Sequence, residues 1–258
     1  MNKERRLEIP LASGMKLAGV LHIPDDRPKG EPTAGVLICH GMLSYKDSPK
    51  HLGLARQLAE KGLAVLRFDF QGRGDSPGDL MGLSFTRQVI EARAALETLR
   101  RETGVERFAL VGSSMGGAVA TILAASGLRG LEAMVTFAAV ARPADLGPRM
   151  VDAKGLAVWR DRGWLDFEGE RVGIAWFDDA QVTEVLGPAA RVSCPWLILH
   201  GEQDDVVPVE ESRALHEACP VHSRLEIITG ADHQFNAPEH LAQIMQRAVA
   251  FLSDALMP

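Results

Sequence analysis

Ser114 is the residue of this chain whose surroundings best fit a nucleophile. It stands at the centre of Gly112-Ser113-Ser114-Met115-Gly116, with a glycine two residues away on either side. This spacing suits a sharp strand-to-helix turn, where neighbouring backbone passes close to a strained nucleophile. An apolar run (108–111) precedes the pattern and an alanine-rich segment follows it. That context favours a nucleophile over the alternative, a glycine-rich packing turn with an inert serine.

A serine hydroxyl is a weak nucleophile at neutral pH and needs a base that is itself oriented by a third group. Among the eight histidines, His233 fits the base best, because it lies in a polar loop between an expected strand and the last helix. Asp204 and Asp205 follow another expected strand, and either could be the orienting carboxylate. His40 and His200 each end a strand before a glycine, which suits roles in turns, and the side chain of His40 is expected to brace its loop.

The tetrahedral intermediate of acyl transfer needs two fixed hydrogen-bond donors. The backbone N–H of Met115, directly after the nucleophile, is the first candidate. The second is expected in the loop after the strand at 34–39, where Gly41 lets the chain turn inward and Met42 presents its N–H.

Alternating strands and helices are expected to hold these residues in place. After an antiparallel hairpin (6–11 and 16–23) and a polar loop from Pro24 to Pro32, buried strands are expected at 34–39, 64–70, 108–111, 131–140, 196–199 and 225–228. Helices are expected at 49–61, 85–101, 114–125, 210–218 and 240–252. This alternation predicts an α/β fold with a mostly parallel sheet covered on both faces, and with ligands at the carboxyl ends of the strands.

Residues 142–192 depart from this alternation and are predicted to form a small lid, inserted into a core made of residues 1–141 and 193–258. The lid is rich in aromatic residues. Trp159, Trp164 and Trp176 are candidates to line an apolar substrate pocket, and the equally good alternative is that they only pack the insertion onto the sheet.

Composition excludes several classes of function. A net charge of −6 argues against a nucleic-acid partner. Three cysteines without CxxC spacing indicate reduced thiols and a cytoplasmic protein. Residues 108–128 carry no charge, but glycines break this run, so a strand, a turn and a buried helix are expected in place of a membrane span. No metal motif or nucleotide loop is present, and no cofactor is expected.

Several motifs together resemble the α/β-hydrolase superfamily: His40-Gly41, Asp69-x-x-Gly72-x-Gly74-x-Ser76, Gly112-x-Ser114-x-Gly116-Gly117, Gly201-x-x-Asp204-x-x-Val207-Pro208 and Asp232-His233. The resemblance implies the α/β-hydrolase fold, a serine triad in the chain order Ser, Asp, His, and Asp204 as the acid. Within the superfamily, the Phe68–Gly74 stretch and the small lid resemble bacterial feruloyl or cinnamoyl esterases and related carboxylesterases. Many relatives have histidine where this chain has Ser113, a position that is not catalytic in the family.

The expected function is therefore hydrolysis of carboxylic esters through an acyl-enzyme. The expected partners are a small-molecule ester and at most a second copy of the chain, as a homodimer. Three alternatives remain open. The same site could serve an aminopeptidase-like serine peptidase, with Glu168, Glu170, Asp178 and Asp179 as an acidic cluster, or a thioesterase or acyltransferase. The third alternative is a non-catalytic binding protein of the hydrolase fold.

Overall fold

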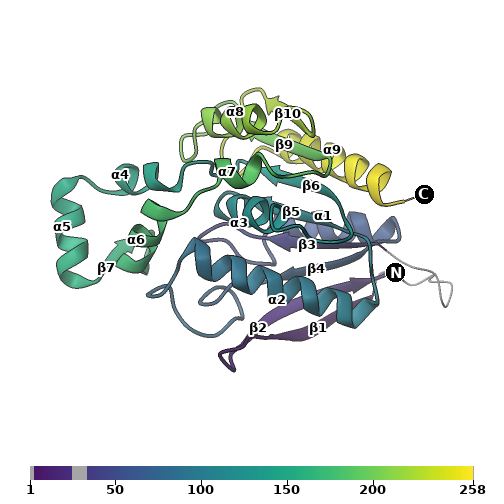
Figure 1. Cartoon of the computed structure of the whole chain (residues 1–258), viewed down its shortest axis with the longest axis horizontal. Coiled ribbons are helices and arrows are strands. Elements are labelled where there is room, and N and C mark those ends of the chain that lie inside the picture. The colour runs from purple at the N-terminus through teal and green to yellow at the C-terminus, as the bar shows by residue number, and fades with distance from the viewer. Residues whose placement is uncertain (1–2, 25–33, 258) are drawn as a thin grey trace.

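The computed structural model describes residues 3–24 and 34–257, whose centre is an eight-stranded sheet in the order β1-β2-β4-β3-β5-β6-β9-β10 (Figure 1). Only β2 runs against the other strands of this sheet in the described part of the chain. The strands are β1 Lys3–Pro10, β2 Lys16–Ile23, β3 Gly35–Cys39, β4 Ala64–Phe68, β5 Phe108–Ser113, β6 Leu131–Phe137, β9 Trp196–Gly201 and β10 Ser223–Ile228.

Helices cover both faces of the sheet. They are α1 Pro49–Glu60, α2 Phe85–Thr103, α3 Met115–Ala124, α8 Val209–Ala218 and α9 Pro238–Leu256. Local signals set their ends: the Ser48 hydroxyl caps α1, which has a proline in its first turn, and Ser84 caps α2, which stops at Gly104 in the left-handed region.

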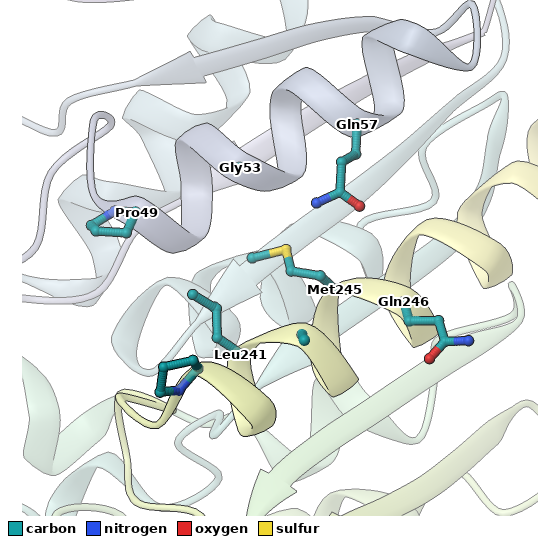
Figure 2. A pocket seen from close by; sticks show the side chains of 8 residues that line it. Pro49, Gly53, Gln57, Leu241, Met245 and Gln246 are labelled. Atoms are coloured by element: carbon teal, nitrogen blue, oxygen red, sulfur yellow. The ribbon is translucent and has the colours of Figure 1, made fainter.

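Alternate residues of the buried strands belong to two separate apolar clusters, because successive side chains of a strand point to opposite faces. Leu37 and Leu110 pack with α2, α3 and α8. Val36 and Val111 pack with α1 and α9. Figure 2 shows a groove on this second side, where Leu241 and Met245 of α9 point toward α1. Ser114, Asp204 and His233 do not line that groove.

Residues 142–192, the predicted lid, are called the insertion from here on. The insertion projects from the rest of the molecule, as Figure 1 shows for α4 to α6. It comprises a 3₁₀ turn η1 Pro143–Asp145, the helices α4 Gly147–Met150, α5 Ala153–Arg162, α6 Ile174–Val182 and α7 Leu186–Ala189, and the hairpin strands β7 Trp164–Phe167 and β8 Glu170–Gly173. At its entry, the buried Glu211 carboxylate accepts hydrogen bonds from the N–H groups of Ala141 (2.8 Å) and Arg142 (2.7 Å). Trp159, Trp176 and Phe177 of the insertion belong to the apolar cluster that contains α2 and α3, and Phe167 packs against it.

Most expected elements occur within a few residues of their expected bounds, and the α/β-hydrolase fold is confirmed. The strand expected at 131–140 ends at Phe137, because Ala138 turns the chain with φ 46°. The β7–β8 hairpin was not expected. Residues 108–128 form β5 and α3 as predicted, and no helix in the described part of the chain is long and apolar enough to cross a membrane. Most of the polar loop from Pro24 to Pro32 lies outside the described residues.

Candidate active site

Ser114 sits on a strained turn between β5 and α3, with φ 54° and ψ −122°. The flanking glycines are required by close backbone approach and not by their own dihedral angles. A Cβ on Gly112 would lie 2.3 Å from the Gly116 carbonyl oxygen. A Cβ on Gly116 would lie 2.3 Å from the carbonyl oxygen of His40, at the end of β3. Gly112 therefore lets the turn close onto the start of α3, and Gly116 lets it approach the end of β3. This is the close backbone approach that the sequence pattern predicted.

The β3–α1 loop (residues 40–48) lies directly against Ser114. A Cβ on Gly41 would be 3.1 Å from Ser114 Cβ and 3.7 Å from its Oγ. In the described part of the chain, the N–H of Met42 makes no internal hydrogen bond. Met115 is the first residue of α3, so its N–H has no partner within that helix. Two backbone donors of the kind that an oxyanion requires are thus available on either side of Ser114.

His233 connects Ser114 to a carboxylate. Its Nε2 lies 3.1 Å from Ser114 Oγ, and its Nδ1 lies 2.7 Å from Asp204 Oδ2. The imidazole is buried, with 7% of the residue exposed. Asp205 is exposed, and it is Asp204 that reaches the histidine. The loop after β10 and the loop after β9 therefore converge on Ser114 at the carboxyl ends of the strands.

The Asp204 carboxylate accepts hydrogen bonds on both oxygens. Oδ1 accepts from the N–H groups of Val206 (3.0 Å) and Val207 (2.8 Å), while Oδ2 faces His233 and His200. Burial alone would raise the pKa of this carboxyl group, but the hydrogen bonds from His200 and His233 outweigh burial and hold the pKa well below its usual range. Asp204 is thus an anion that fixes the orientation of His233.

His200 is a residue whose contacts sequence reasoning missed. It is fully buried, and its Nε2 lies 3.1 Å from Asp204 Oδ2 and 2.8 Å from the Val207 carbonyl oxygen. Its Nδ1 lies 2.6 Å from the Ser212 hydroxyl. The turn role that the following glycine indicates is therefore incomplete, because His200 also contacts the Asp204 carboxylate. Their spacing of four residues gives no signal of this contact, because His200 lies in β9 and Asp204 in the loop that follows, and such a spacing brings side chains together only on a helix.

Lys50, in the first turn of α1, is a second residue that sequence reasoning missed. It is buried, and its ammonium group lies 5.6 Å from the ring centre of Phe137 and 5.4 Å from that of Phe235. Burial lowers the pKa of Lys50 to about 8, although the charges of Asp204 and Asp232 act to raise it. The pattern of α1 marks position 50 as helical but gives no sign that a lysine would be buried there.

The expectation that His40 braces the β3–α1 loop agrees with its contacts. His40 is buried, its Nε2 accepts a hydrogen bond from the Phe70 N–H (3.0 Å), and its Nδ1 lies 2.7 Å from the Gly41 carbonyl oxygen. Burial lowers the pKa of His40 to about 4, so the ring is neutral at neutral pH. The ring therefore carries its proton on Nδ1 and fixes the backbone next to Met42.

A profile described as "Serine aminopeptidase, S33" matches residues 30–163, which is more than half of the chain. The chain belongs to this α/β-hydrolase family. It is 30% identical to the uncharacterized protein Rv2307c of Mycobacterium tuberculosis over 92% of this chain and 74% of that protein. It is 27% identical to the human mitochondrial palmitoyl-protein thioesterase ABHD10 over 67% of this chain and 58% of that protein.

Solved structures share the fold. The ferulic acid-bound structure of Est1E from Butyrivibrio proteoclasticus superimposes with a TM-score of 0.86 at 22% sequence identity, and the match covers 98% of this chain and all of that chain. At this identity the likeness shows the fold alone. The family match identifies the chain as a serine hydrolase, and the solved structure agrees with the α/β-hydrolase fold.

Of the three tryptophans that were candidates to line a pocket of this α/β-hydrolase, Trp159 and Trp176 are buried, which agrees with the alternative that they only pack the insertion. Trp159 is fully buried and Trp176 is 1% exposed; their rings stack with centres 6.0 Å apart. Trp159 Nε1 also donates to the Val172 carbonyl (3.0 Å). In this arrangement both residues hold the insertion together and present no surface to a substrate. Trp164 is half-buried, with two guanidinium groups over its ring, those of Arg162 and Arg171.

No three His, Cys, Asp or Glu side chains gather to form a metal site among residues 3–24 and 34–257. Cys39, Cys194 and Cys219 are buried free thiols, and burial raises the pKa of each. A thiol whose pKa is raised is a poor nucleophile. The side chains in direct contact at this site are Ser114, His233 and Asp204.

Proposed function

We propose that this chain hydrolyses carboxylic esters, with Ser114 as nucleophile, His233 as general base and Asp204 as the orienting acid. The observation that carries the proposal is the unbroken line of contacts from Asp204 through both ring nitrogens of His233 to Ser114 Oγ. The strained backbone of Ser114 and the two backbone donors beside it support the same chemistry. Chemistry of this kind suits a small-molecule ester.

In the proposed reaction, Ser114 Oγ attacks the ester carbonyl carbon while His233 Nε2 takes the hydroxyl proton. The N–H groups of Met42 and Met115 bind the negatively charged oxygen of the tetrahedral intermediate. As the intermediate collapses, the leaving alcohol takes the proton from His233. Water then attacks the acyl-enzyme with His233 again as base, and this step releases the carboxylic acid and restores Ser114.

Most of the acidic residues of the insertion that an aminopeptidase would use already have partners within the protein. Recognition of a substrate ammonium group calls for carboxylates that are free to pair with it, and three of the four acidic residues considered for that role are already engaged. These pairs are Glu170 with Arg73 (2.7 Å), Asp178 with Arg160 (3.1 Å) and Asp179 with the Thr86 hydroxyl (2.6 Å). Glu168 turns the β7–β8 hairpin with φ 50°.

Hydrolysis of a panel of esters tests the proposal. The panel holds p-nitrophenyl esters from short to long acyl chains together with methyl hydroxycinnamates. We expect hydrolysis by the wild-type protein and a fall in kcat of roughly 10⁴–10⁶-fold for Ser114→Ala. A loss below tenfold in this variant, or no hydrolysis of any ester by the wild type, contradicts the proposal.

Thioester hydrolysis is the second candidate, and the likeness to a palmitoyl-protein thioesterase favours it. The same residues would carry it out, because a thioester is attacked at the same carbonyl carbon. Matched oxygen and sulfur esters of one acyl chain separate the two functions. A kcat/KM at least tenfold higher for the sulfur ester, after correction for the reactivity of each ester with hydroxide, assigns the thioesterase.

A further inference from the structure

Arg73 links the insertion to the β3–α1 loop. Its side chain is 14% exposed, and all three of its donating nitrogens are engaged. Nη2 donates to the Leu43 carbonyl oxygen at 2.6 Å, Nε donates to the Ser44 carbonyl oxygen at 3.2 Å, and Nη1 pairs with the Glu170 carboxylate at 2.7 Å. The planar guanidinium therefore holds two backbone carbonyls of the loop that follows Met42 and one carboxylate of the insertion.

The direction of the Met42 N–H depends on the peptide group that Met42 shares with Gly41. In a trans peptide the C=O and the N–H point to opposite sides, so fixing one fixes the other. The Gly41 carbonyl oxygen accepts from His40 Nδ1 (2.7 Å) and from the Ser44 N–H (3.2 Å). These two hydrogen bonds set the direction of the Met42 N–H.

Arg73 controls the second of these hydrogen bonds. The Ser44 N–H belongs to the same peptide group as the Leu43 carbonyl, which accepts from Arg73 Nη2. The guanidinium thus orients the peptide whose N–H orients the Gly41 carbonyl. A chain of two peptide groups runs from Arg73 to the proposed oxyanion donor.

The loop that carries Arg73 is held by close packing and by hydrogen bonds of the buried Asp69. Gly74 has φ 50°, and a Cβ there would lie 2.2 Å from Asp69 Oδ2. Asp69 is fully buried and binds both the backbone N–H (2.6 Å) and the ammonium group (2.7 Å) of Lys46. Arg73 therefore projects from a rigid base, and its guanidinium position depends on its three partners.

Glu170 belongs to β8, and the end of that strand rests on the loop after β4. The N–H of Gly173 donates to the Leu80 carbonyl (3.0 Å), and a Cβ on Gly173 would lie 1.8 Å from the Met81 carbonyl oxygen. The packing of the β7–β8 hairpin on this loop thus determines the position of the Glu170 carboxylate. Glu170 is the one partner of Arg73 that belongs to the insertion, since the other two are carbonyls of the β3–α1 loop.

We infer that Arg73 is a positioning residue for the oxyanion donor Met42. Through the ion pair of Arg73 with Glu170, the direction of the Met42 N–H then depends on how the insertion packs on the loop after β4. The inference rests on the proposed function, because it takes the Met42 N–H as an oxyanion donor. It deepens that function by giving the insertion a part in catalysis.

The rate at which an alkyl fluorophosphonate modifies Ser114 tests the inference without a known substrate, because phosphonylation also builds negative charge on an oxygen in this hole. The maximal rate of modification and the half-saturating reagent concentration are measured separately for each variant. We expect the maximal rate to fall roughly 10–100-fold in Arg73→Gln and roughly 3–10-fold in Glu170→Gln, with little change in the half-saturating concentration. Arg73→Gln/Glu170→Gln should match Arg73→Gln alone, because Glu170 acts only through Arg73.

Asp178→Ala is the matched control, since it removes an ion pair that lies wholly within the insertion, and it should keep the wild-type rate. Modification of wild type and both single variants at equal rates overturns the inference while leaving the proposed function intact. Additive effects in the double variant overturn the dependence on the insertion. A wild-type protein that is not modified at all overturns the inference together with the proposed function. Should Arg73→Gln fail to fold, the half-exposed Glu170→Gln decides alone, and a wild-type rate then overturns the inference.

Discussion

At the scale of single residues, Asp204 and Asp205 differ in surroundings while being identical in type. Asp204 is enclosed by two histidines and two backbone N–H groups, whereas Asp205 is exposed. The residues of this loop allow either aspartate to be the orienting carboxylate, and only the resemblance to the α/β-hydrolase family selects Asp204. A sequence does not reveal which of two adjacent side chains turns inward, because that depends on the loop conformation that the rest of the fold imposes.

Asp204→Asn separates the two carboxylates by function. The amide keeps the shape but cannot hold the charge or the tautomer of His233, so kcat should fall by about 10⁴-fold. The matched control is Asp205→Asn, which should stay within about twofold of wild type because position 205 is exposed. Ester hydrolysis rates of the three proteins check this, and a larger loss in Asp205→Asn than in Asp204→Asn would reverse the assignment.

Burial of the charged Lys50 side chain lowers the free energy of unfolding by an amount that depends on pH. Its pKa is about 8 in the folded state and 10.5 without burial, so the folded chain binds fewer protons between these values and gains stability as the pH rises through this window. Lys50→Met should therefore raise the free energy of unfolding at pH 7 by about 1–3 kcal/mol.

That gain should shrink between pH 8 and 10.5, and urea unfolding across this range measures it. The exposed Lys61→Met provides the control, which should show no such trend. A difference between Lys50→Met and wild type that stays constant from pH 7 to 10.5 would contradict the account of this lysine.

At the scale of elements, the sequence predicted the core well and the insertion poorly. Buried parallel strands are short continuous apolar runs, so β3, β4 and β5 were visible in the sequence. The strands β7 and β8 have four residues each, and their turn uses positive φ at Glu168 and Gly169. Strands this short have too few positions for an alternating pattern, and Glu168 is not a residue typical of such a turn.

Two glycine-to-alanine changes should act in opposite directions. In Gly116→Ala the new methyl group meets the backbone at the end of β3, 2.3 Å from the His40 carbonyl oxygen. The free energy of unfolding should fall by roughly 3 kcal/mol, and fluorophosphonate should modify Ser114 more slowly. In Gly53→Ala, within α1, the methyl group meets nothing within 4 Å, so stability should rise by about 0.5–1 kcal/mol. Urea unfolding of both variants measures the two effects. Equal effects would contradict this steric account of the turn at Ser114.

At the scale of the whole molecule, three buried neutral histidines make the fold sensitive to acid. Burial lowers the pKa of His22 to about 4, of His40 to about 4 and of His51 to about 3. Within the described residues, His22 Nδ1 and His51 Nε2 have no hydrogen-bond partner. Because the unfolded chain takes up these protons near pH 6.5, stability is present above that pH and is lost as the pH falls toward 4.

The free energy of unfolding should accordingly fall by at least ~1 kcal/mol per pH unit between about pH 6.5 and 4. His51→Gln should flatten this slope, while His222→Gln, at an exposed position, should leave it unchanged. Urea titrations at several pH values give the slopes, and identical slopes for wild type and His51→Gln would count against the histidines as its source.

The most direct test of the central claim is to locate the adduct that an alkyl fluorophosphonate leaves on the protein. Peptide mapping by mass spectrometry gives the modified residue, and Ser114→Ala serves as the reference. We predict one adduct, on Ser114, that is absent from the variant, together with loss of ester hydrolysis in the variant. An adduct on another residue, or a variant that still hydrolyses esters at the wild-type rate, would contradict the assignment of Ser114 as the nucleophile.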